Sequence, residues 1–296
     1  MTSTVGVVVI TKDRPERVLE TVQGLCALPE RPPIVVVDNG SVRSAGAALR
    51  NVGPAVTVLE LPVNIGAAAR NVGVAALGTR YVAFCDDDVR WDDGCLQKAT
   101  ELLDAHPDVA VVVAQLMDQR GGGSDPICDV LAASPLRAGS FPGPALVGFL
   151  AGVSVVRRAA LMQAGGFLDR FLIGGEEELL AIDLLARGWT IVYSCELTAW
   201  HDPGERDVEA RRVLTIRNRL WTIWLRYPVV PALKCTAKEL RVHRRRGISA
   251  AVAACRHGRW VIRARRPMPA SVLADIRAVH TSRLSGGVAS DSLIVS

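Results

Sequence analysis

Three consecutive aspartates, Asp86-Asp87-Asp88, are the residues of this sequence best suited to chemistry. They follow an apolar run at 81–85 that has the composition of a buried strand. Adjacent carboxylates repel each other, so a fold rarely gathers them without a cation. Oxygen ligands suit Mg²⁺ or Mn²⁺, held by one or two carboxylates together with substrate phosphates. The alternative is a solvated acidic turn that caps the following helix.

Two further segments could bind a nucleotide. Asp38 follows an apolar run at 34–37 and could accept hydrogen bonds from a base N–H or a ribose hydroxyl. The alternative there is an ordinary Asp-Asn-Gly turn. Residues 64–73 open a helix with small residues and one arginine, Arg70, which could face a phosphate together with the helix N-terminus. The alternative is a packed helix with one exposed arginine.

An acidic run and a histidine complete the candidates. The acidic run of Glu176, Glu177 and Glu178 begins a predicted helix, where carboxylates ordinarily complement the helix dipole. One of them could instead serve as a general base toward a sugar acceptor. His201 lies between a predicted strand and a change in the character of the chain, so it is either structural or a metal ligand.

The elements that must position these residues alternate regularly. Strand-like runs at 5–10, 34–37, 56–59, 81–85 and 109–114 alternate with predicted helices, of which the first is capped by Asp13 with Glu16. This alternation predicts an α/β fold with a mostly parallel, doubly wound sheet. Ligands of such sheets lie beyond the carboxyl ends of the strands, where Thr11, Asp38 and the aspartate run all fall.

The second half of the chain is less regular. Residues 121–144 are rich in Gly, Pro and Ser and predict a long loop, followed by a helix at 176–187 and a strand at 190–193. Basic helices are predicted at 207–227, 230–246 and 248–263, with a frayed tail of about 20 residues. We therefore predict two domains, a catalytic domain at 1–204 and a basic helical extension at 205–296.

Charge and composition bear on partners and location. The net charge is +5, but residues 1–204 carry 16 basic against 24 acidic residues, whereas 205–296 carry 19 against 6. The basic helices are interleaved with tryptophans and could rest on an anionic membrane surface; no motif indicates nucleic acid. We see no signal peptide, no spanning segment and no regular cysteine spacing. These features predict a cytoplasmic protein, either free or peripheral on the inner face of the membrane.

In their order and spacing, these pieces resemble the family 2 glycosyltransferases of the GT-A fold, over about residues 4–202. The matching pieces are Thr11 and Arg14 after the first strand, Asp38-Asn39-Gly40-Ser41, Asn64-x-Gly66, Arg70-Asn71-x-Gly73, Asp86-Asp87-Asp88, Gly165-Gly166-Phe167, Gly175-Glu176-Glu177, Gly188-Trp189 and Trp200-His201.

The resemblance implies a Rossmann-like nucleotide-sugar-binding domain and a role for each candidate. Asp38 would contact the nucleobase in a pocket lined by Thr11 and Arg14, and Asp86 would hold the ribose side. Asp88 would bind a Mg²⁺ or Mn²⁺ that bridges the diphosphate, with Asp86 and His201 as further metal contacts. The remaining predicted nucleotide-sugar contacts are Asn64, Gly66, Arg70 and Asp87, and the general base is Glu177 or its neighbour Glu176.

The reaction implied is inverting, metal-assisted sugar transfer from a nucleoside-diphosphate sugar to the hydroxyl of a glycan, a lipid-linked or a small-molecule acceptor. Such a reaction belongs to glycan, cell-envelope polysaccharide, glycolipid or natural-product biosynthesis. The sequence departs from the family at Leu179 and Asp183, where an aspartate and an arginine are usual. A nucleotidyltransferase is an alternative, but it needs a glycine-rich loop that residues 11–15 lack. A non-catalytic sugar-nucleotide-binding scaffold is the other alternative.

Overall fold

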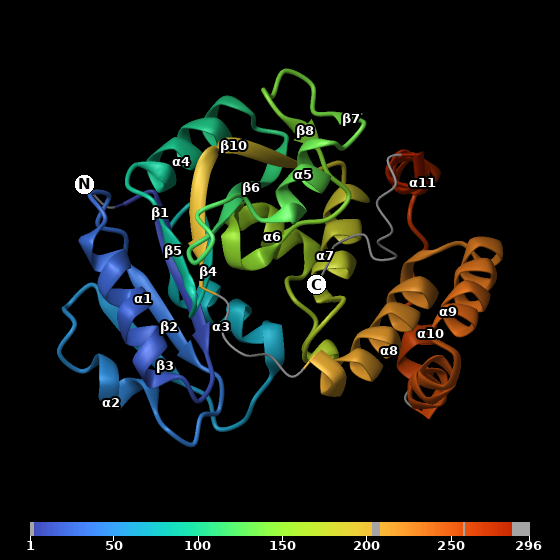
Figure 1. The fold of residues 1–296 in the computed structure, drawn as a ribbon, viewed down its shortest axis with the longest axis horizontal. Coiled ribbons are helices and arrows are strands. Elements are labelled where there is room, and N and C mark those ends of the chain that lie inside the picture. Colours follow the sequence, from blue (N-terminus) through green and yellow to red (C-terminus); the bar gives the residue numbers. More distant parts are fainter. Residues whose placement is uncertain (1–2, 203–207, 257, 286–296) are drawn as a thin grey trace.

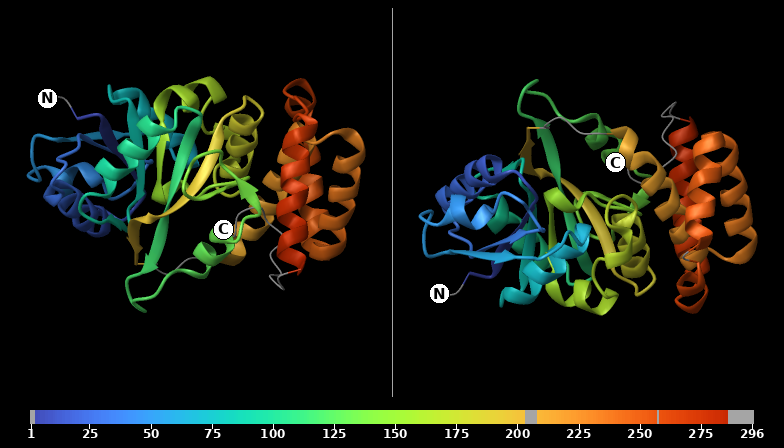
Figure 2. Two further views of the ribbon diagram at one scale, coloured as in Figure 1. Left: turned by 90° about the horizontal axis from the view of Figure 1, so that it is seen from above. Right: turned by 90° about the horizontal axis from the view of Figure 1, so that it is seen from below.

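The computed structural model describes residues 3–202, 208–256 and 258–285. In these residues ten strands form one mixed sheet with helices on both sides, and the C-terminal helices lie together at one end of the molecule (Figures 1 and 2). The strands are β1 (Val5–Thr11), β2 (Ile34–Asp38), β3 (Val56–Glu60), β4 (Tyr81–Asp86), β5 (Val89–Trp91), β6 (Val109–Asp118), β7 (Leu136–Arg137), β8 (Pro144–Ala145), β9 (Ser154–Arg157) and β10 (Thr190–His201).

The structure has α-helices, labelled α, and short 3-10 helices, labelled η. In chain order they are α1 (Pro15–Ala27), α2 (Ala45–Leu49), η1 (Gly66–Ala68), α3 (Ala69–Ala76), α4 (Cys95–Ala105), α5 (Pro126–Ala132), η2 (Ala151–Val153), α6 (Arg158–Ala164), η3 (Asp169–Phe171), α7 (Glu176–Leu185), α8 (Val208–Arg226), α9 (Val229–Arg256), α10 (Arg259–Arg263) and α11 (Ala270–Ser285).

The sheet has the order β3-β2-β1-β4-β9-β6-β10-β8-β7, with β5 paired to β10. The first four strands are parallel, as their continuous apolar runs predict, and both β1 and β2 are buried over almost their whole length. β9 then inserts antiparallel between β4 and β6. The predicted α/β fold is confirmed, and antiparallel strands make its predicted mostly parallel sheet a mixed one.

The strand register brings the predicted polar residues to one edge. Thr11 lies opposite Asp38, and Ile10 lies opposite Asp86, so the carboxyl ends of β2, β1 and β4 are neighbours. The α3 helix can approach the sheet closely because Gly73 lies against Val8 and Val37, where a β-carbon would be 2.5 Å from a Val8 methyl group. The first turn of α3, which carries Arg70, therefore lies at the same edge.

Asp13 does not cap the first helix, so that prediction is wrong. The α1 N-cap is Arg14, and no side chain caps it. Asp13 instead has a φ of 56°, and its Oδ1 accepts hydrogen bonds from the backbone amides of Val42, at 2.6 Å, and Arg43. Its partner in the predicted capping box, Glu16, pairs with Arg43. The neighbouring β2–α2 loop therefore competes successfully for both carboxylates.

Three predicted boundaries also differ from the structure. Residues 121–144 contain α5 and the small strands β7 and β8, so they are not one long loop. The break between the predicted second and third basic helices falls at the kink of α9, at Arg244, rather than at residue 247, and the end of the predicted third helix is the separate α10. Part of the predicted frayed tail belongs to α11, which continues to Ser285; residues 286–296 lie outside the described residues.

The C-terminal helices share a core with the sheet domain. Ile182 of α7 and Val147 pack with Ile223, Tyr227 and residues of α11 in one buried apolar cluster. A second cluster joins Phe171 and Leu179 to residues of α8, α9 and α10. Among the helices described, none is long and apolar enough to cross a membrane. The extension predicted at 205–296 is thus packed directly onto α7.

Candidate active site

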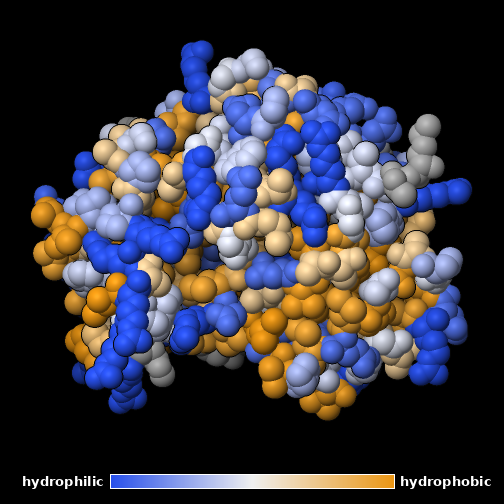
Figure 3. Space-filling model, turned by 180° about the vertical axis from the view of Figure 1, so that it is seen from behind, coloured by the Kyte–Doolittle hydropathy of each residue, from blue (hydrophilic) through white to orange (hydrophobic). Residues whose placement is uncertain are grey.

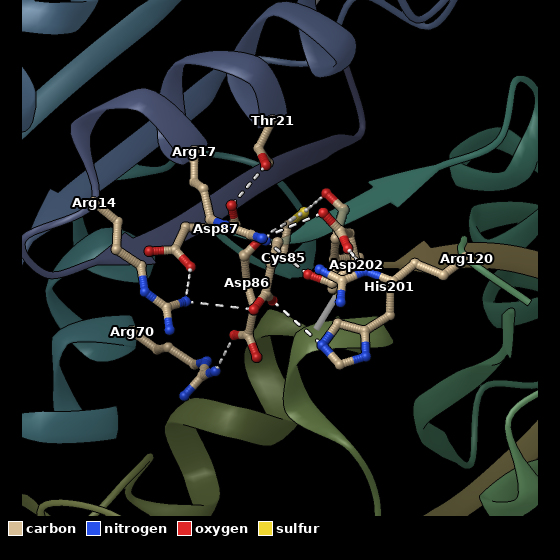
Figure 4. Close-up of polar contacts among 12 residues, drawn as sticks. Arg14, Arg17, Thr21, Arg70, Cys85, Asp86, Asp87, Arg120, His201 and Asp202 are labelled. Carbon is tan, nitrogen blue, oxygen red and sulfur yellow. Dashed lines mark hydrogen bonds and ion pairs between the residues drawn. The ribbon is translucent and has the colours of Figure 1, made fainter. Parts of the chain in front are cut away.

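Asp87, the middle residue of the three aspartates, is hydrogen-bonded to residues of the first strand and the first helix (Figure 4). Thr11 Oγ1 donates to Asp87 Oδ2 at 2.7 Å, and Arg14 Nη1 donates to Asp87 Oδ1 at 3.0 Å. Thr21 Oγ1 also donates to the Asp87 carbonyl at 2.9 Å. Burial raises the pKa of Asp87, while the Thr11 hydroxyl and the Arg14 guanidinium oppose the rise. Thr11, Arg14 and Asp87 therefore form one hydrogen-bonded unit.

Asp86 faces the helix that carries Arg70. The Arg70 Nη2 atom lies 2.5 Å from Asp86 Oδ1, and the Arg70 side chain is only 7% exposed. Its guanidinium lies 6.0 Å from the centroid of the Phe84 ring and 5.5 Å from that of Phe167, and these two rings pack against each other with centroids 5.6 Å apart, so the cation rests against an aromatic pair. Gly152 passes directly over Asp86, where a β-carbon would be 2.5 Å from Oδ2. A side chain at this position would displace the Asp86 carboxylate.

Asp88 faces the end of β10. Its Oδ1 lies 3.6 Å from His201 Nε2, and its Oδ2 lies 3.4 Å from Arg14 Nη1. The backbone amide of Asp202 donates to the Asp88 carbonyl at 3.0 Å, and Asp202 itself pairs with Arg17 and Arg120. Two segments more than 100 residues apart are thereby joined (Figure 4).

The donor set at this point suits a divalent cation shared with a substrate. A carboxylate oxygen of Asp88, in a side chain 2% exposed, and an imidazole nitrogen of His201 face each other. Within the described residues, no group of three or more His, Cys, Asp and Glu side chains forms a complete protein-only metal centre. Mg²⁺ and Mn²⁺ sites commonly take one or two protein ligands and complete their shell with phosphates and water.

The loops that would hold the nucleotide are shaped by Asp38 and Asn39. Asp38 accepts hydrogen bonds from the amides of Ser41, at 3.0 Å, and Ala45, at 2.7 Å, and is 2% exposed. Asn39 bonds both to the Ile65 amide and to the Gly66 carbonyl, each at 2.9 Å. The contact of Asp38 with a nucleobase stays a prediction, because both of its oxygens already serve the β2–α2 loop.

Asn64 and Gly66 form a turn beside these loops. Asn64 Oδ1 accepts from the Gly66 amide at 2.8 Å, and Gly66 has a φ of 63°. A β-carbon at Gly66 would lie 1.7 Å from the Leu172 carbonyl oxygen, so a side chain is excluded there. The turn is consequently pressed against the loop that precedes α7.

Glu176 and Glu177 open α7 on the other side of Asp86. The Ala151 amide, next to Gly152, donates to Glu177 Oε1 at 2.6 Å. Burial and, next, the charge of Glu176 raise the pKa of Glu177 to about 8. Burial likewise raises the pKa of Glu176, whose Oε2 is buried without a hydrogen-bond partner among the described residues. Glu178 points to the C-terminal helices, and burial raises its pKa too, with Arg219 and Glu239 nearby.

The structure brings nearly all the predicted residues to one edge of the sheet. Asp86, Asp87 and Asp88 contact Arg70, Thr11, Arg14 and His201, and the Ala151–Gly152 turn links Asp86 to Glu177. Asp38, Asn64 and Gly66 lie beside them without direct contact to the aspartates.

Several residues at this edge escaped the sequence analysis. The Ala151–Gly152 turn acts through its backbone and leaves no side-chain signal. Asn71, by contrast, lies within the matching motif and bonds to both the amide and the carbonyl of Phe167, at 2.9 and 2.7 Å. Its spacing from Arg70 could have identified it as the residue that places Phe167 against the arginine.

The model of glycosyl transferase family 2 matches residues 6–162, which is more than half of the chain. The chain belongs to glycosyl transferase family 2. It is therefore a glycosyltransferase that uses a nucleotide sugar. A search of curated proteins gives no match.

Solved structures resemble the family 2 chain in fold. A mannosyltransferase from Pyrobaculum calidifontis in complex with GDP-Man and Mn²⁺ aligns with a TM-score of 0.61 at 19% identity, over 97% of this chain and 84% of its own. S. aureus TarS 1–349 in complex with UDP aligns at 0.56 and 18%, over 80% and 69% of the two chains. GalNAc-T7 with UDP, GalNAc and Mn²⁺ aligns at 0.60 and 13%, over 77% and 49%. These likenesses confirm the GT-A fold.

Proposed function

We propose that this transferase catalyses inverting, metal-assisted transfer of a sugar from a nucleoside-diphosphate sugar to an acceptor hydroxyl. The proposal rests on one observation: side chains suited to a donor and a side chain suited to an acceptor lie together at one edge of the sheet. The aspartates and Arg70 are suited to a diphosphate donor, and Glu177, joined to them through the Ala151–Gly152 turn, is suited to an acceptor.

Asp88 and His201 are the residues that would hold a Mg²⁺ or Mn²⁺ ion, because their ligand atoms face each other at the end of the aspartate run. The bound ion supplies positive charge against the diphosphate of the donor. The mannosyltransferase and GalNAc-T7, which were solved with Mn²⁺ and a nucleotide sugar or nucleotide, support this assignment. Asp38, Thr11, Arg14, Asn64 and Gly66 would line the nucleoside side, with Asp86 on the ribose side and Asp87 organising the turn.

Glu177 would act as the general base. Its ionised carboxylate takes the proton from the acceptor hydroxyl as the hydroxyl oxygen bonds to the anomeric carbon. The bond from that carbon to the diphosphate oxygen breaks on the opposite face, and the electron pair leaves with the nucleoside diphosphate. One displacement of this kind inverts the anomeric configuration. Arg70 lies on the donor side, where its charge would favour the departing diphosphate.

Calorimetric titration with UDP, GDP, dTDP and CDP, each with Mn²⁺ and with EDTA, tests the donor site. One nucleotide is expected to bind in the presence of Mn²⁺ and to bind about tenfold or more weakly in EDTA, because the phosphates otherwise meet the carboxylates unscreened. The stereochemistry of the product from the matching sugar nucleotide, followed by NMR, tests the displacement. Failure of every nucleotide to bind, or retention of configuration, contradicts the proposal.

The acceptor side is bordered by the C-terminal helices, whose outer face suits an anionic membrane surface. On α9 the exposed basic residues stand among exposed apolar ones, and its one acidic residue, Glu239, is buried. The left edge of Figure 3, where the extension lies in that view, shows hydrophobic and strongly hydrophilic residues side by side. The exposed members are Lys234, Lys238, Arg241, Arg244, Arg245, Arg246 and Arg256 with Val229, Val230, Leu233, Val242, Ile248 and Val252.

We therefore propose that the enzyme works at the inner face of a membrane on a lipid-linked or envelope-glycan acceptor, with a small-molecule acceptor as the alternative. Replacing Arg241, Arg244 and Arg245 with glutamine is expected to weaken binding to vesicles containing phosphatidylglycerol by about 100-fold. This estimate takes about 1 kcal/mol for each basic residue near the surface. Vesicle flotation measures the change, and binding to neutral phosphatidylcholine vesicles should stay weak in both proteins.

The matched control removes three exposed arginines from the sheet domain, at Arg31, Arg50 and Arg137, and so has the same net charge. It should bind anionic vesicles like the wild type. Equal losses in the two triple variants would attribute the binding to net charge alone and would contradict a docking face on α9.

A further inference from the structure

The loop between α6 and α7 contains a backbone conformation that ordinary side chains rarely adopt. Leu172 has a φ of 60° and a ψ of −66°, and the Ile173 amide bonds back to the Phe171 carbonyl at 2.7 Å. These features define a γ-turn with positive φ at its centre, which is rare and strained. Such strain persists only where the surrounding structure holds it, and it gathers at functional sites. α7, with Glu176 and Glu177, begins only four residues later.

The turn is held on one side by the donor edge of the sheet. The Ala67 amide donates to the Leu172 carbonyl at 3.0 Å, and the absence of a side chain at Gly66 makes this approach sterically feasible. The residues predicted to contact the sugar nucleotide are therefore in direct contact with the loop that leads to the predicted base.

On its other side the turn is held by Asn218 of α8, which belongs to the C-terminal extension. Asn218 is fully buried, and its Nδ2 lies 2.7 Å from the Phe171 carbonyl, 2.9 Å from that of Ile173 and 2.6 Å from that of Gly174. Its Oδ1 accepts from the Arg217 guanidinium at 2.8 and 3.1 Å, so the amide cannot turn over without losing these bonds.

The chain is also packed tightly against α8 at the two residues that lead into α7. Gly174 and Gly175 have φ values of 82° and 85°. A β-carbon at Gly174 would lie 2.6 Å from Thr215 Oγ1, and one at Gly175 would lie 3.3 Å from the Asn218 β-carbon. The first turn of α7 therefore starts from backbone that α8 fixes by both contact and hydrogen bonding.

The far end of α7 is fixed to the same helix. Asp183 accepts two hydrogen bonds from Arg226, from Nε at 2.6 Å and from Nη2 at 2.9 Å, in a largely buried pair. Asp183 is one of the positions at which the sequence departs from its family. In this chain the aspartate at that position pairs with Arg226 of α8. The α8 helix therefore contacts α7 at both of its ends.

We infer that Asn218, although it lies in the C-terminal extension, is a positioning residue for sugar transfer: it holds the γ-turn at Leu172 and thereby sets where α7 presents its acidic first turn. This inference rests on the proposed function of Glu177 as the base. On this view the extension is an integral part of the transferase. The α8 helix holds α7 and the loop before it in place, which the sheet domain alone would not do.

Replacing Asn218 with alanine is expected to lower kcat by about 10- to 100-fold, as small displacements of catalytic groups do. The dissociation constant of the nucleotide with Mn²⁺ should change by less than about twofold, because Asn218 has no contact with the strand ends that carry Asp38 and the aspartates, and the turn at Gly66 keeps its own hydrogen bond to Asn64. Turnover is measured as nucleoside-diphosphate release from UDP-glucose, UDP-N-acetylglucosamine, GDP-mannose or dTDP-rhamnose, using the donor that wild type consumes fastest. Asn218→Ser, which keeps one hydrogen-bond donor, should give an intermediate rate and serves if the alanine variant folds poorly.

Rescue in the loop separates positioning from general support. Adding Leu172→Gly to Asn218→Ala is expected to restore kcat by about 5- to 10-fold, because glycine adopts the positive φ without strain. Ile223→Val is the matched control: Ile223 is buried on the same helix and packs with Ile182 of α7, but it lies in a different apolar cluster from Phe171. Losing one methylene there tests general packing of α8 on α7 and should leave kcat close to wild type.

Hydrogen exchange of the amides at 171–178 provides a readout that needs no substrate. Protection there should fall in Asn218→Ala and stay unchanged in Ile223→Val. Wild-type turnover and exchange protection that both survive Asn218→Ala would overturn the inference. If wild type turns over no sugar nucleotide, the proposed function fails instead, and unchanged exchange in Asn218→Ala would then overturn the positioning inference by itself.

Discussion

Replacing Glu177 with glutamine should reduce sugar transfer by about 10²- to 10⁴-fold, the range attributed to a positioned general base. Glutamine keeps the size of the side chain, and its amide oxygen can still accept from the Ala151 amide. The variant nevertheless cannot take a proton from the acceptor hydroxyl. Nucleotide binding with Mn²⁺ should remain close to wild type, so the loss should appear in kcat.

The matched control is Glu176→Gln, one residue earlier on the same helix turn. If Glu177 is the base, this variant should keep activity within about tenfold of wild type, since it only removes a neighbouring negative charge. The reverse pattern, with a large loss in Glu176→Gln and a small one in Glu177→Gln, would assign the base to Glu176.

The pH dependence of the wild type provides a further sign of the same group. Burial and Glu176 raise the pKa of Glu177 to about 8, so the carboxyl is protonated and inactive as a base below that pH. We expect kcat/KM to rise with pH through about 8, because that ratio reports ionisation in the free enzyme. Glu176→Gln should move this rise to lower pH, because it removes the second cause of the pKa shift. An unshifted profile in Glu176→Gln would count against Glu177 as the titrating group.

Replacing Asp88 with asparagine should remove the Mn²⁺ dependence of nucleotide binding. Losing a direct carboxylate ligand is expected to weaken Mn²⁺ affinity by at least about 100-fold, since even outer-shell changes cost about 10- to 100-fold. Calorimetric titration of Mn²⁺ into the protein with UDP or GDP measures this change. Asp88 forms an ion pair with Arg14 and lies against His201. Asparagine has nearly the same shape as aspartate, so the substitution removes the charge without opening a gap between these side chains.

Asp93→Asn is the control, because Asp93 is an exposed carboxylate a few residues further along the chain. It should leave the metal dependence intact. Unaltered Mn²⁺-dependent binding in Asp88→Asn would refute the assignment of Asp88 as the metal ligand and would leave Asp86 as the next candidate.

Local features of the sequence were enough to predict the strands and the residues at their ends. The runs before Thr11, Asp38 and Asp86 are apolar, and the first two are rich in β-branched residues, which suits strands covered on both faces. Because parallel strands end at the same edge, the aspartates, Thr11 and Asp38 could be expected together there. The predicted helix cap at Asp13 was wrong because the backbone amides of Val42 and Arg43, which are distant in the sequence, donate to its carboxylate instead.

The sequence by itself determined the family, the α/β alternation and the chemical types available at the sheet edge, since these depend on residue type and short spacing. The family resemblance already placed His201 with Asp88, but only the tertiary structure decided that Glu177 meets the turn over Asp86 and that Asn218 meets the loop before α7. Each of these contacts joins distant segments through backbone atoms or single side chains. Such pairings depend on how the strands and helices pack in space, and short-range patterns in a sequence carry no record of that packing.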